Sequence, residues 1–398
     1  MAFERDIIRA LSSQLREIPD LIHLVAGPRQ VGKTTAVRAV VAAWDGPARY
    51  AAADELGAPG PGWLRTQWEL ARRDAARGPA LLVLDEVQKA AGWSEQVKGL
   101  WDADRSAARP LRVILLGSSA LLLGAGVTES LAGRFVRHRC THWSYAECRD
   151  AFGWDLDRWI AFGGYPGGAP WLARGDEDGW KAWVRDALIE TVLGRDVLSM
   201  HRVTKPALLR HLFVLSCAYP AQALSYTKML GQLQDAGNTT TLAHYLQLLD
   251  AAFLVRGLEK TSLGAVRSRG TSPKLVARNN ALVTALDLHP FEALRADPAA
   301  WGRLVENAVG LHLVNLLDGL PVEIGWWRER DAEVDFVLRS GDQTVAIEVK
   351  SGHKRDMHGL DTFLRRFPAA RPLVVGPGGM ALEEFFTTAP RDLLWIVP

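Results

Sequence analysis

Residues 21–43 read LIHLVAGPRQVGKTTAVRAVVAA, and this stretch decides the fold of the N-terminal part of the chain. The run at 21–26 is apolar and is followed by a glycine, which predicts a short buried strand. A glycine-containing turn comes next, and the segment from Gly32 to Ala43 is typical of a helix. A strand joined to a helix by such a turn is the first unit of an α/β fold.

The same alternation of strand and helix continues to about residue 141. ALLVLDE (80–86) and RVILLG (112–117) are further buried strands. We expect strands at 21–26, 49–53, 80–86, 112–117 and 131–141, and helices at 32–43, 63–76 and 93–104. This order predicts a parallel sheet covered by helices.

The octapeptide GPRQVGKT (27–34) matches the spacing G-x-x-x-x-G-K-T between the predicted strand and helix. Consecutive backbone N–H groups at such a turn surround phosphates, provided that glycine lets the backbone come close. We therefore expect ATP to bind here, with Lys33 on the β- and γ-phosphates and the Thr34 hydroxyl on Mg²⁺. A chance match in a turn is the alternative. The expected nucleotide contacts are Gly27, Pro28, Arg29, Gln30, Val31, Gly32, Lys33, Thr34 and Thr35.

A second motif, LLVLDE (81–86), places two acids at the end of a buried strand. Asp85 is expected to hold Mg²⁺ through water beside the phosphate loop. Glu86 is expected to orient or deprotonate the water that attacks ATP. A helix N-cap is the alternative for this pair, and the phosphate loop upstream favours ATP hydrolysis.

Three further polar residues are candidates for work on the γ-phosphate. Ser118 follows the strand at 112–117, where a polar side chain senses that phosphate; a helix N-cap has equal weight. Arg134 in LAGRF and Arg195 in LGRDV are candidate arginine fingers, which stabilise charge on the transferred phosphoryl group. For either arginine, a structural salt bridge is the alternative.

Residues 224–260 have the spacing of a winged helix-turn-helix, with a second helix at Thr239–Asp250. The exposed face of that helix offers Thr239, Thr240 and His244 but no arginine, which is poor for base readout. A basic run beyond it suits phosphate contacts with DNA without sequence preference. A fold used only for packing or oligomer contacts is the alternative. The run consists of Arg256, Lys260, Arg267, Arg269, Lys274 and Arg278, with one acid, Glu259.

Charged residues also end two predicted strands in EVDFVLRSGDQTVAIEVKSG (333–352). Asp335 lies in one strand, and Glu348 and Lys350 lie on one face of the next, because side chains alternate with a period of two. Opposite charges at the end of an otherwise apolar strand require an explanation. A predicted helix upstream carries Glu306.

The ordered set GPRQVGKT, LDEVQK, LLGSSALL, SLAGR and FGGYP resembles bacterial and archaeal AAA-type ATPases with an uncharacterised C-terminal domain. The resemblance covers nearly the whole chain. The C-terminal charges resemble the PD-(D/E)xK nuclease core. That resemblance implies Mg²⁺ ligation by Asp335 and Glu348, a catalytic Lys350 and an auxiliary acid, Glu306. Val334 departs from the proline common before the Asp, and a fold kept only for binding is the alternative.

The bulk composition limits the remaining classes. The 398 residues carry a net charge of +2, which excludes a uniformly basic nucleic-acid coat but not a local basic patch. Three cysteines are too few and too scattered for a disulfide framework, and we expect them to be buried. Without a signal core or a membrane-spanning run, we expect a cytoplasmic protein without a membrane partner.

We therefore predict an α/β chain with a P-loop parallel-sheet ATPase domain, a winged helix and a restriction-endonuclease-like α/β domain. The function expected is an ATP-hydrolysing machine that acts on DNA, with branched DNA as one substrate class, and that forms a homo-oligomer such as a ring. An ATP-gated nuclease and an ATP-switched DNA-binding regulator are the alternatives. The expected domains are an ATPase core at 1–145, a helical extension at 146–205, a winged helix at 206–280 and the nuclease-like domain at 290–398.

Overall fold

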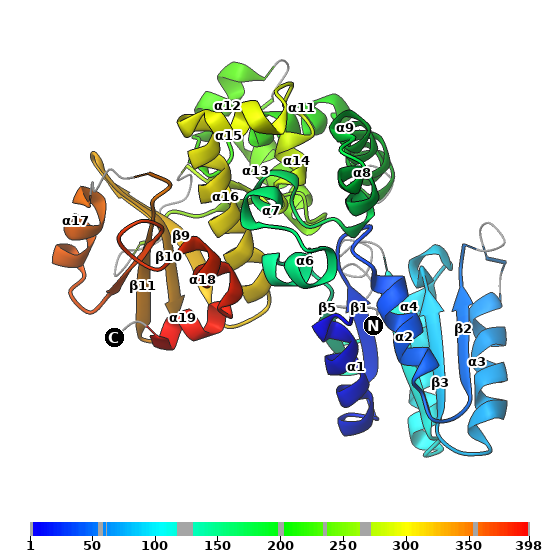
Figure 1. Cartoon of the computed structure of the whole chain (residues 1–398). Helices are drawn as coiled ribbons and strands as arrows, with labels where there is room; N and C mark the ends of the chain where they lie inside the picture. The colour runs from blue at the N-terminus through cyan, green and yellow to red at the C-terminus, as the bar shows by residue number, and fades with distance from the viewer. Residues whose placement is uncertain are drawn as a thin grey trace. The chain divides into compact units, whose positions relative to one another are not determined.

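The computed structural model describes residues 3–54, 59–60, 62–117, 130–197, 203–233, 237–262, 272–352 and 357–396. The chain divides into two compact units, Met1–Thr141 and His142–Pro398 (Figure 1). The finer division of the second unit into three domains stays a prediction. Among the described helices, none combines the length and the apolar character needed to cross a membrane.

The first unit contains a parallel sheet of five strands in the order β2-β3-β4-β1-β5. The parallel sheet is confirmed, and each element lies close to its predicted range. The strands are β1 (Ile22–Ala26), β2 (Ala48–Ala52), β3 (Ala80–Asp85), β4 (Leu111–Gly117) and β5 (Phe135–Arg139). The helices are α1 (Asp6–Glu17), α2 (Lys33–Ala42), α3 (Trp63–Ala75) and α4 (Trp93–Ser106), with a short 3₁₀ helix η1 (Val87–Lys89).

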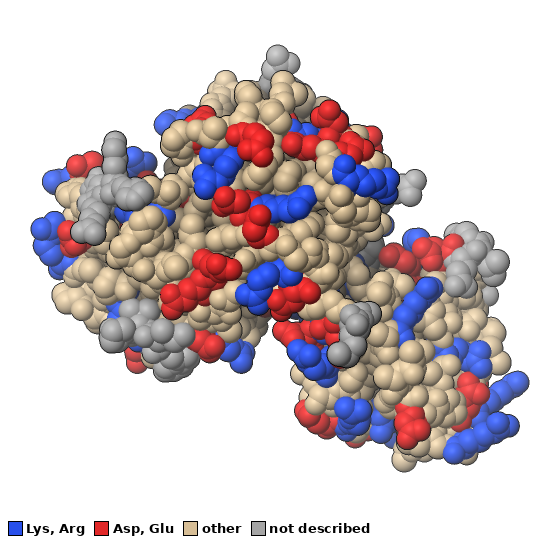
Figure 2. Space-filling view, viewed as in Figure 1, with Lys and Arg blue, Asp and Glu red and all other residues tan. Residues whose placement is uncertain are grey.

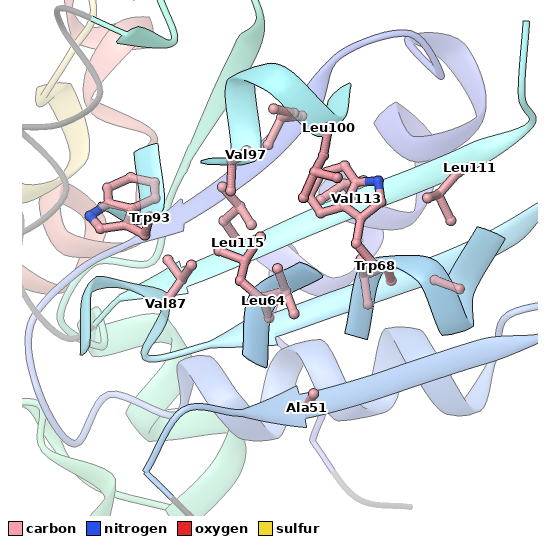
Figure 3. Packing of buried hydrophobic residues seen from close by; sticks show 14 of the residues in the cluster. Ala51, Leu64, Trp68, Val87, Trp93, Val97, Leu100, Leu111, Val113 and Leu115 are labelled. Atoms are coloured by element: carbon pink, nitrogen blue, oxygen red, sulfur yellow. The ribbon is translucent and has the colours of Figure 1, made fainter. Parts of the chain in front are cut away.

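The core of this unit explains why β1 and β3 are apolar throughout. Every residue of both strands is buried, because helices cover both faces of a parallel sheet. On one face, Trp68 and Leu64 of α3 and Val97 of α4 pack over Val113 and neighbouring strand residues (Figure 3). The carboxyl ends of these strands are thereby held rigidly, and the loops that leave them share one edge of the sheet.

Two histidines form a buried pair between β1 and β5. The Nδ1 of His23 lies 2.9 Å from the Nε2 of His138, and the Nε2 of His23 lies 3.2 Å from the carbonyl oxygen of Ile18. A carbonyl only accepts, so His23 carries its proton on Nε2, and His138 donates to His23 Nδ1. Burial lowers the pKa of each imidazole to about 4.

The histidine pair predicts acid sensitivity of the first unit. Each folded pKa lies below its ordinary value of 6.5, so the stability contribution is complete above pH 6.5 and is lost as the pH falls towards 4. Replacing His138 with glutamine, whose amide still donates to His23, should reduce the stability lost between pH 7 and pH 5 by about 1–2 kcal/mol. Denaturant unfolding at the two pH values measures this loss. Equal losses for variant and wild type would contradict it.

The second unit begins with a helical region, which the sequence predicted as helical. Its glycine loop at 162–168 is built for close packing, because a Cβ on Gly163 would lie 1.8 Å from the side-chain oxygen of Asn279. Gly163 also has a φ of 66°. The elements are α6 (Tyr145–Phe152), α7 (Leu156–Phe162), η2 (Pro166–Gly168), α8 (Ala169–Ala173), α9 (Glu177–Trp183) and two π-helical segments, η3 (Val184–Ile189) and η4 (Val192–Val197).

The middle of the second unit contains three helices and a small antiparallel sheet with the order β6-β8-β7. The two helices expected between 224 and 251 are both present, and Asn238 caps the second of them by accepting from the Thr241 N–H at 2.8 Å. The elements are α11 (Pro206–Ala218), β6 (Gln222–Ala223), α12 (Tyr226–Gln232), α13 (Thr239–Ala251), β7 (Val255–Leu258) and β8 (Lys274–Ala277).

The C-terminal part follows the expected order of helix, three strands, helix and strand, and two further helices come after it. Its sheet has the order β12-β11-β10-β9, in which only β11 and β12 are parallel. Helix α17 packs on one face, and α16 approaches the other through Gly310, beside the Phe336 ring. The elements are α14 (Ala281–Thr284), α15 (Phe291–Ala296), α16 (Pro298–Leu317), β9 (Glu323–Glu329), β10 (Ala332–Ser340), β11 (Gln343–Val349), α17 (His358–Arg366), β12 (Arg371–Val375), α18 (Leu382–Thr387) and α19 (Pro390–Ile396).

Candidate functional site

The predicted phosphate loop joins β1 to α2 at the carboxyl edge of the first sheet. Gly27 is required there by space, because a Cβ would lie 1.9 Å from the carbonyl oxygen of Cys140. Gly32 has a φ of 87° and is the N-cap residue of α2. The first turn of α2 then begins with Lys33 and Thr34, so both side chains leave the helix at its positive end.

Lys33 is folded back onto its own loop. Its side chain is buried, and its Nζ donates to the carbonyl oxygens of Gly27 at 3.0 Å and Pro28 at 2.5 Å. Burial lowers the pKa of this ammonium group. Phosphate oxygens are stronger acceptors than these carbonyls, so the ammonium is held ready for an anion.

Asp85 brings the two predicted motifs together. The hydroxyl of Thr34 donates to Asp85 Oδ2 at 3.0 Å, which joins the start of α2 to the end of β3. The N–H of Glu86 donates to the other carboxylate oxygen at 2.8 Å. Glu86 itself has a φ of 50°, a sparsely populated conformation that turns the chain away after the strand. A hydroxyl and a carboxylate at this separation are suitable oxygen ligands for Mg²⁺.

Two residues of this site were missed by the sequence analysis. The hydroxyl of Tyr50, on β2, donates to Asp85 Oδ2, and the Arg38 guanidinium lies 5.0 Å from the Tyr50 ring centroid. Arg5 is buried and donates to the carbonyl oxygen of Val31 at 3.0 Å. Neither residue belongs to a sequence motif, and each is far from its partner along the chain.

The three candidates for the γ-phosphate have different outcomes. Ser118 lies outside the described residues, and so does the side chain of Arg195. Arg134 precedes β5 and accepts a bond through its carbonyl oxygen from the Ile22 N–H, at the amino end of β1. It therefore lies at the edge opposite the phosphate loop of its own chain. Its guanidinium donates to both oxygens of Asp102, at 2.8 and 3.1 Å, which favours the salt-bridge alternative.

In the second unit, the structure brings together the predicted C-terminal charges. The Nζ of Lys350 lies 2.6 Å from Glu348 Oε1, and the Val349 N–H donates to Asp335 Oδ2 at 2.8 Å. A register shift between Val334 and Val337 marks a bulge in β10 at Asp335. Bulges of this kind redirect a side chain, and this one lies where Asp335 meets β11.

A residue that the sequence analysis assigned elsewhere completes this cluster. Lys274 of β8 is fully buried, and its Nζ lies 2.6 Å from Glu306, 3.3 Å from Asp335 and 3.5 Å from Glu333. Burial opposes its charge, but Glu306 and Asp335 outweigh that effect and raise its pKa. Lys274 is therefore the counter-ion of three carboxylates.

This arrangement does not fit a divalent cation. The ammonium group of Lys274 already bonds Glu306 and lies beside Asp335, which are two of the predicted ligands. Burial and the neighbouring Asp335 raise the pKa of both Glu306 and Glu348, because each charged carboxylate is crowded by another. Within the described ranges, no group of three His, Cys, Asp or Glu residues is arranged to hold a metal ion.

Most of the described residues in the predicted basic run form ion pairs within the protein. Arg256 pairs with Asp250 at 2.9 Å, and the buried Arg278 lies 3.3 Å from the same aspartate and 3.4 Å from Asp318. The prediction of phosphate contacts is wrong for Arg278 and Lys274, which are buried, and it stays a prediction for the partly exposed Arg256. Hydrophobic periodicity does not distinguish a cation on a surface from one that neutralises a buried acid. Arg267 and Arg269 lie outside the described residues.

Comparison with known proteins gives the family of the N-terminal part. Residues 20–149 match the family described as AAA domain. This match supports an AAA-like ATPase domain in this part of the chain. Residues 153–293 and 301–389 match two families described as domains of unknown function, DUF8612 and DUF4143.

The individual proteins that match this chain have low sequence identity to it or match only a short part of it. An uncharacterized protein of Mycobacterium tuberculosis is 28% identical over 397 residues, which are 98% of this chain and 83% of that protein. A UPF0102 protein of Chloroflexus aurantiacus is 39% identical over 61 residues, which are 15% of this chain and 48% of that protein. Among solved structures, a Walker-type ATPase of Pyrococcus abyssi has a TM-score of 0.49 at 16% identity, covering 71% of this chain and 95% of that one.

Proposed function

We propose that the chain hydrolyses ATP with Mg²⁺ and couples this reaction to binding of DNA. The bond between the Thr34 hydroxyl and Asp85, at 3.0 Å, carries the first half of the proposal. It joins the loop that would hold the phosphates to the strand end that would hold the metal. An AAA domain across residues 20–149 supports the same chemistry.

The residues of the loop would divide the work as follows. Lys33 would exchange the carbonyl oxygens of Gly27 and Pro28 for the β- and γ-phosphates. Thr34 and Asp85 would hold Mg²⁺, which neutralises charge on the phosphates when it is bound. Glu86, next to Asp85 at the strand end, would orient the attacking water and accept its proton.

The segment from α11 to β8 supports assignment as a winged helix. Its order is helix, strand, helix, helix, strand, strand, and its antiparallel sheet has the last strand in the centre. In this fold α13 faces DNA. Thr239, Thr240 and His244 are exposed on α13, as expected from the sequence. Short polar side chains without arginine favour binding to the DNA backbone over readout of bases.

For the C-terminal sheet we propose a nuclease-like fold that serves in binding. Its order of α16, β9, β10, β11, α17 and β12 supports the fold. Lys274 within the carboxylate cluster argues against a metal-dependent nuclease, so no cleavage step is assigned to Lys350. A regulator that binds DNA under ATP control, without stimulated turnover, is the remaining alternative.

We further propose a homo-oligomer, with a ring as one form. An arginine finger in trans requires a neighbouring subunit. The ion pair of Arg134 with Asp102 makes Arg134 the weaker candidate, so the finger is assigned to Arg195.

DNA should stimulate ATP turnover by the purified full chain. The direct measurement is phosphate release with Mg²⁺ and ATP in the presence of single-stranded, duplex or branched DNA. We expect stimulation severalfold above the rate without DNA, because a coupled machine releases product faster on its substrate. Gels of the same samples should show intact DNA.

The outcomes of this assay separate the alternatives. DNA binding without any stimulation would support the regulator. Metal-dependent cutting that disappears in Asp335→Ala would support the nuclease and contradict the role of Lys274 as a counter-ion in place of a metal. An absence of ATP hydrolysis under all conditions would contradict the proposed function itself.

A further inference from the structure

On the face of the molecule in Figure 2, Lys and Arg side chains are interspersed with Asp and Glu side chains. A hollow of about 360 Å³ lies where the small antiparallel sheet meets the C-terminal sheet of the second unit. Lys228, in the first turn of α12, forms one side, and Lys260, just after β7, forms another. Arg328 of β9 forms a third. The remaining lining residues are Ala223, Ser225, Ser272 and Trp326. The described lining therefore contains three cations and two hydroxyl groups, and none of its residues is acidic.

The walls of the hollow are held by backbone hydrogen bonds between the two sheets. The Trp326 N–H donates to the Glu259 carbonyl at 3.2 Å, and the Thr261 N–H donates to the Trp326 carbonyl at 2.7 Å. Lys260 lies between these two bonds and pairs with Trp326 as an isolated β-bridge. Side chains alternate along extended chain, so Glu259 and Glu329 point away from the side that carries Lys260 and Arg328.

The three cations are available to an external anion. Lys228 and Arg328 are exposed, and Lys260 is half-buried. No described acid forms an ion pair with either lysine. Arg328 forms an ion pair with Glu333, opposite it on β10, at 3.7 Å; this distance is longer than a charge-assisted hydrogen bond and leaves the donors of the guanidinium open to a second acceptor.

A separate observation concerns the same wall. Trp326 is 3% exposed, and its indole Nε1 has no hydrogen-bond partner among the described residues. Buried N–H donors are rarely left without an acceptor, since each costs about 1–3 kcal/mol. This nitrogen is itself out of contact with solvent, so the three cations, and not the indole, would contact an anion in the hollow.

We infer that this hollow binds a phosphodiester group of nucleic acid. Lysine, arginine and serine side chains are the usual contacts to phosphate oxygens, and they require no particular base. The inference rests on the proposed DNA association and gives it a location. One phosphate is held jointly by the proposed winged helix, through Lys228 and Lys260, and by the C-terminal sheet, through Arg328.

The test uses the full chain with the triple variant Lys228→Gln/Lys260→Gln/Arg328→Gln. Binding of a fluorescent duplex is followed by anisotropy between 50 and 300 mM salt, about the range in which phosphate contacts dominate. We expect the variant to bind at least roughly tenfold more weakly at 100 mM salt. The slope of log K against log salt should fall by about 0.9, since the three cations together neutralise one phosphate.

The matched control is Arg365→Gln/Arg366→Gln/Arg391→Gln, which removes the same charge from exposed positions of α17 and α19. It should keep the affinity and most of the slope of the wild type. Both variants should keep basal ATP turnover, since none of these residues belongs to the ATP site. Circular dichroism establishes that both remain folded.

Three results would overturn the inference. If the wild type binds DNA and the triple variant binds it equally well, the hollow is not the contact and the proposed function stands. If the wild type binds no DNA, the DNA half of the proposed function fails as well. If the triple variant loses binding of inorganic phosphate, measured by equilibrium dialysis, but keeps its affinity for DNA, the hollow is a site for free phosphate.

Discussion

Replacing Lys33 with alanine should lower ATP turnover by at least about a hundredfold, because the main positive charge on the β- and γ-phosphates is lost. In the structure this ammonium group is buried and bonded to two carbonyl oxygens of its own loop. In the variant, those carbonyl oxygens can accept hydrogen bonds from water or from neighbouring groups instead. The phosphates of ATP lose the cation that the motif places on the β- and γ-phosphates. The N–H groups of the loop, the partial charge of α2 and the other cation of the loop, Arg29, remain.

The measurement combines turnover with nucleotide binding, so that a fall in rate is not confused with unfolding. We expect the variant to retain the circular dichroism spectrum of the wild type and to bind a fluorescent ATP analogue more weakly. Lys98→Ala, on α4, is the matched control and should keep both activities. If Lys33→Ala hydrolyses ATP at a rate within threefold of the wild type, the proposed role of the phosphate loop in ATP hydrolysis is wrong.

Replacing Lys274 with methionine should destabilise the second unit by roughly 3–5 kcal/mol, the usual cost of removing one partner of a buried ion pair. The side chains are similar in length, so the change removes charge with little change in volume. Glu306 and Asp335 then lose the ammonium group that neutralises them, and Glu333 keeps only the ion pair with Arg328 among its described contacts. Denaturant unfolding, with the midpoint and the slope fitted together, gives the loss.

A second substitution distinguishes charge from packing in this cluster. Adding Glu306→Gln to Lys274→Met removes one of the uncompensated acids, so the double variant should recover part of the lost stability. Lys350→Met is the control, because the Lys350 side chain is partly exposed and, among the described residues, forms an ion pair with Glu348 alone. A loss below about 1 kcal/mol for Lys274→Met would mean that the carboxylates are neutralised by protons.

The first unit was largely predictable from the sequence, and the physical reason is locality. A parallel sheet buries whole strands, so apolar runs such as 80–85 mark it clearly, and the phosphate loop marks its first turn. Thr34 and Asp85 were expected to meet because both leave the carboxyl edge of that sheet. Tyr50 and Arg5 were missed because side-chain bonds between distant strands leave no periodic signal.

The second unit was predictable in its elements but not in its charges. The helices of the middle segment and the order of the C-terminal strands were expected from the sequence. The basic run was misassigned because Lys274 and Arg278 resemble surface cations in sequence, and only the fold reveals Glu306 and Asp318 opposite them. The bulge at Asp335 was not predicted either, although three consecutive buried apolar residues (336–338) break the alternation of the strand directly after it.

The ion pairs that Lys274 of β8 forms with Glu306 of α16 and Asp335 of β10 have a consequence for the evolution of this part of the chain. Lys274 belongs to the segment that matches one family, and Glu306 and Asp335 belong to the segment that matches another. Asn307 adds two hydrogen bonds to the backbone of Ala277 across the same seam, at 3.0 and 2.9 Å. A gene fusion that carried either segment alone would leave Lys274, or Glu306 and Asp335, without the oppositely charged partner at a surface that is otherwise apolar. We therefore expect the two segments to be inherited together as a single evolutionary unit.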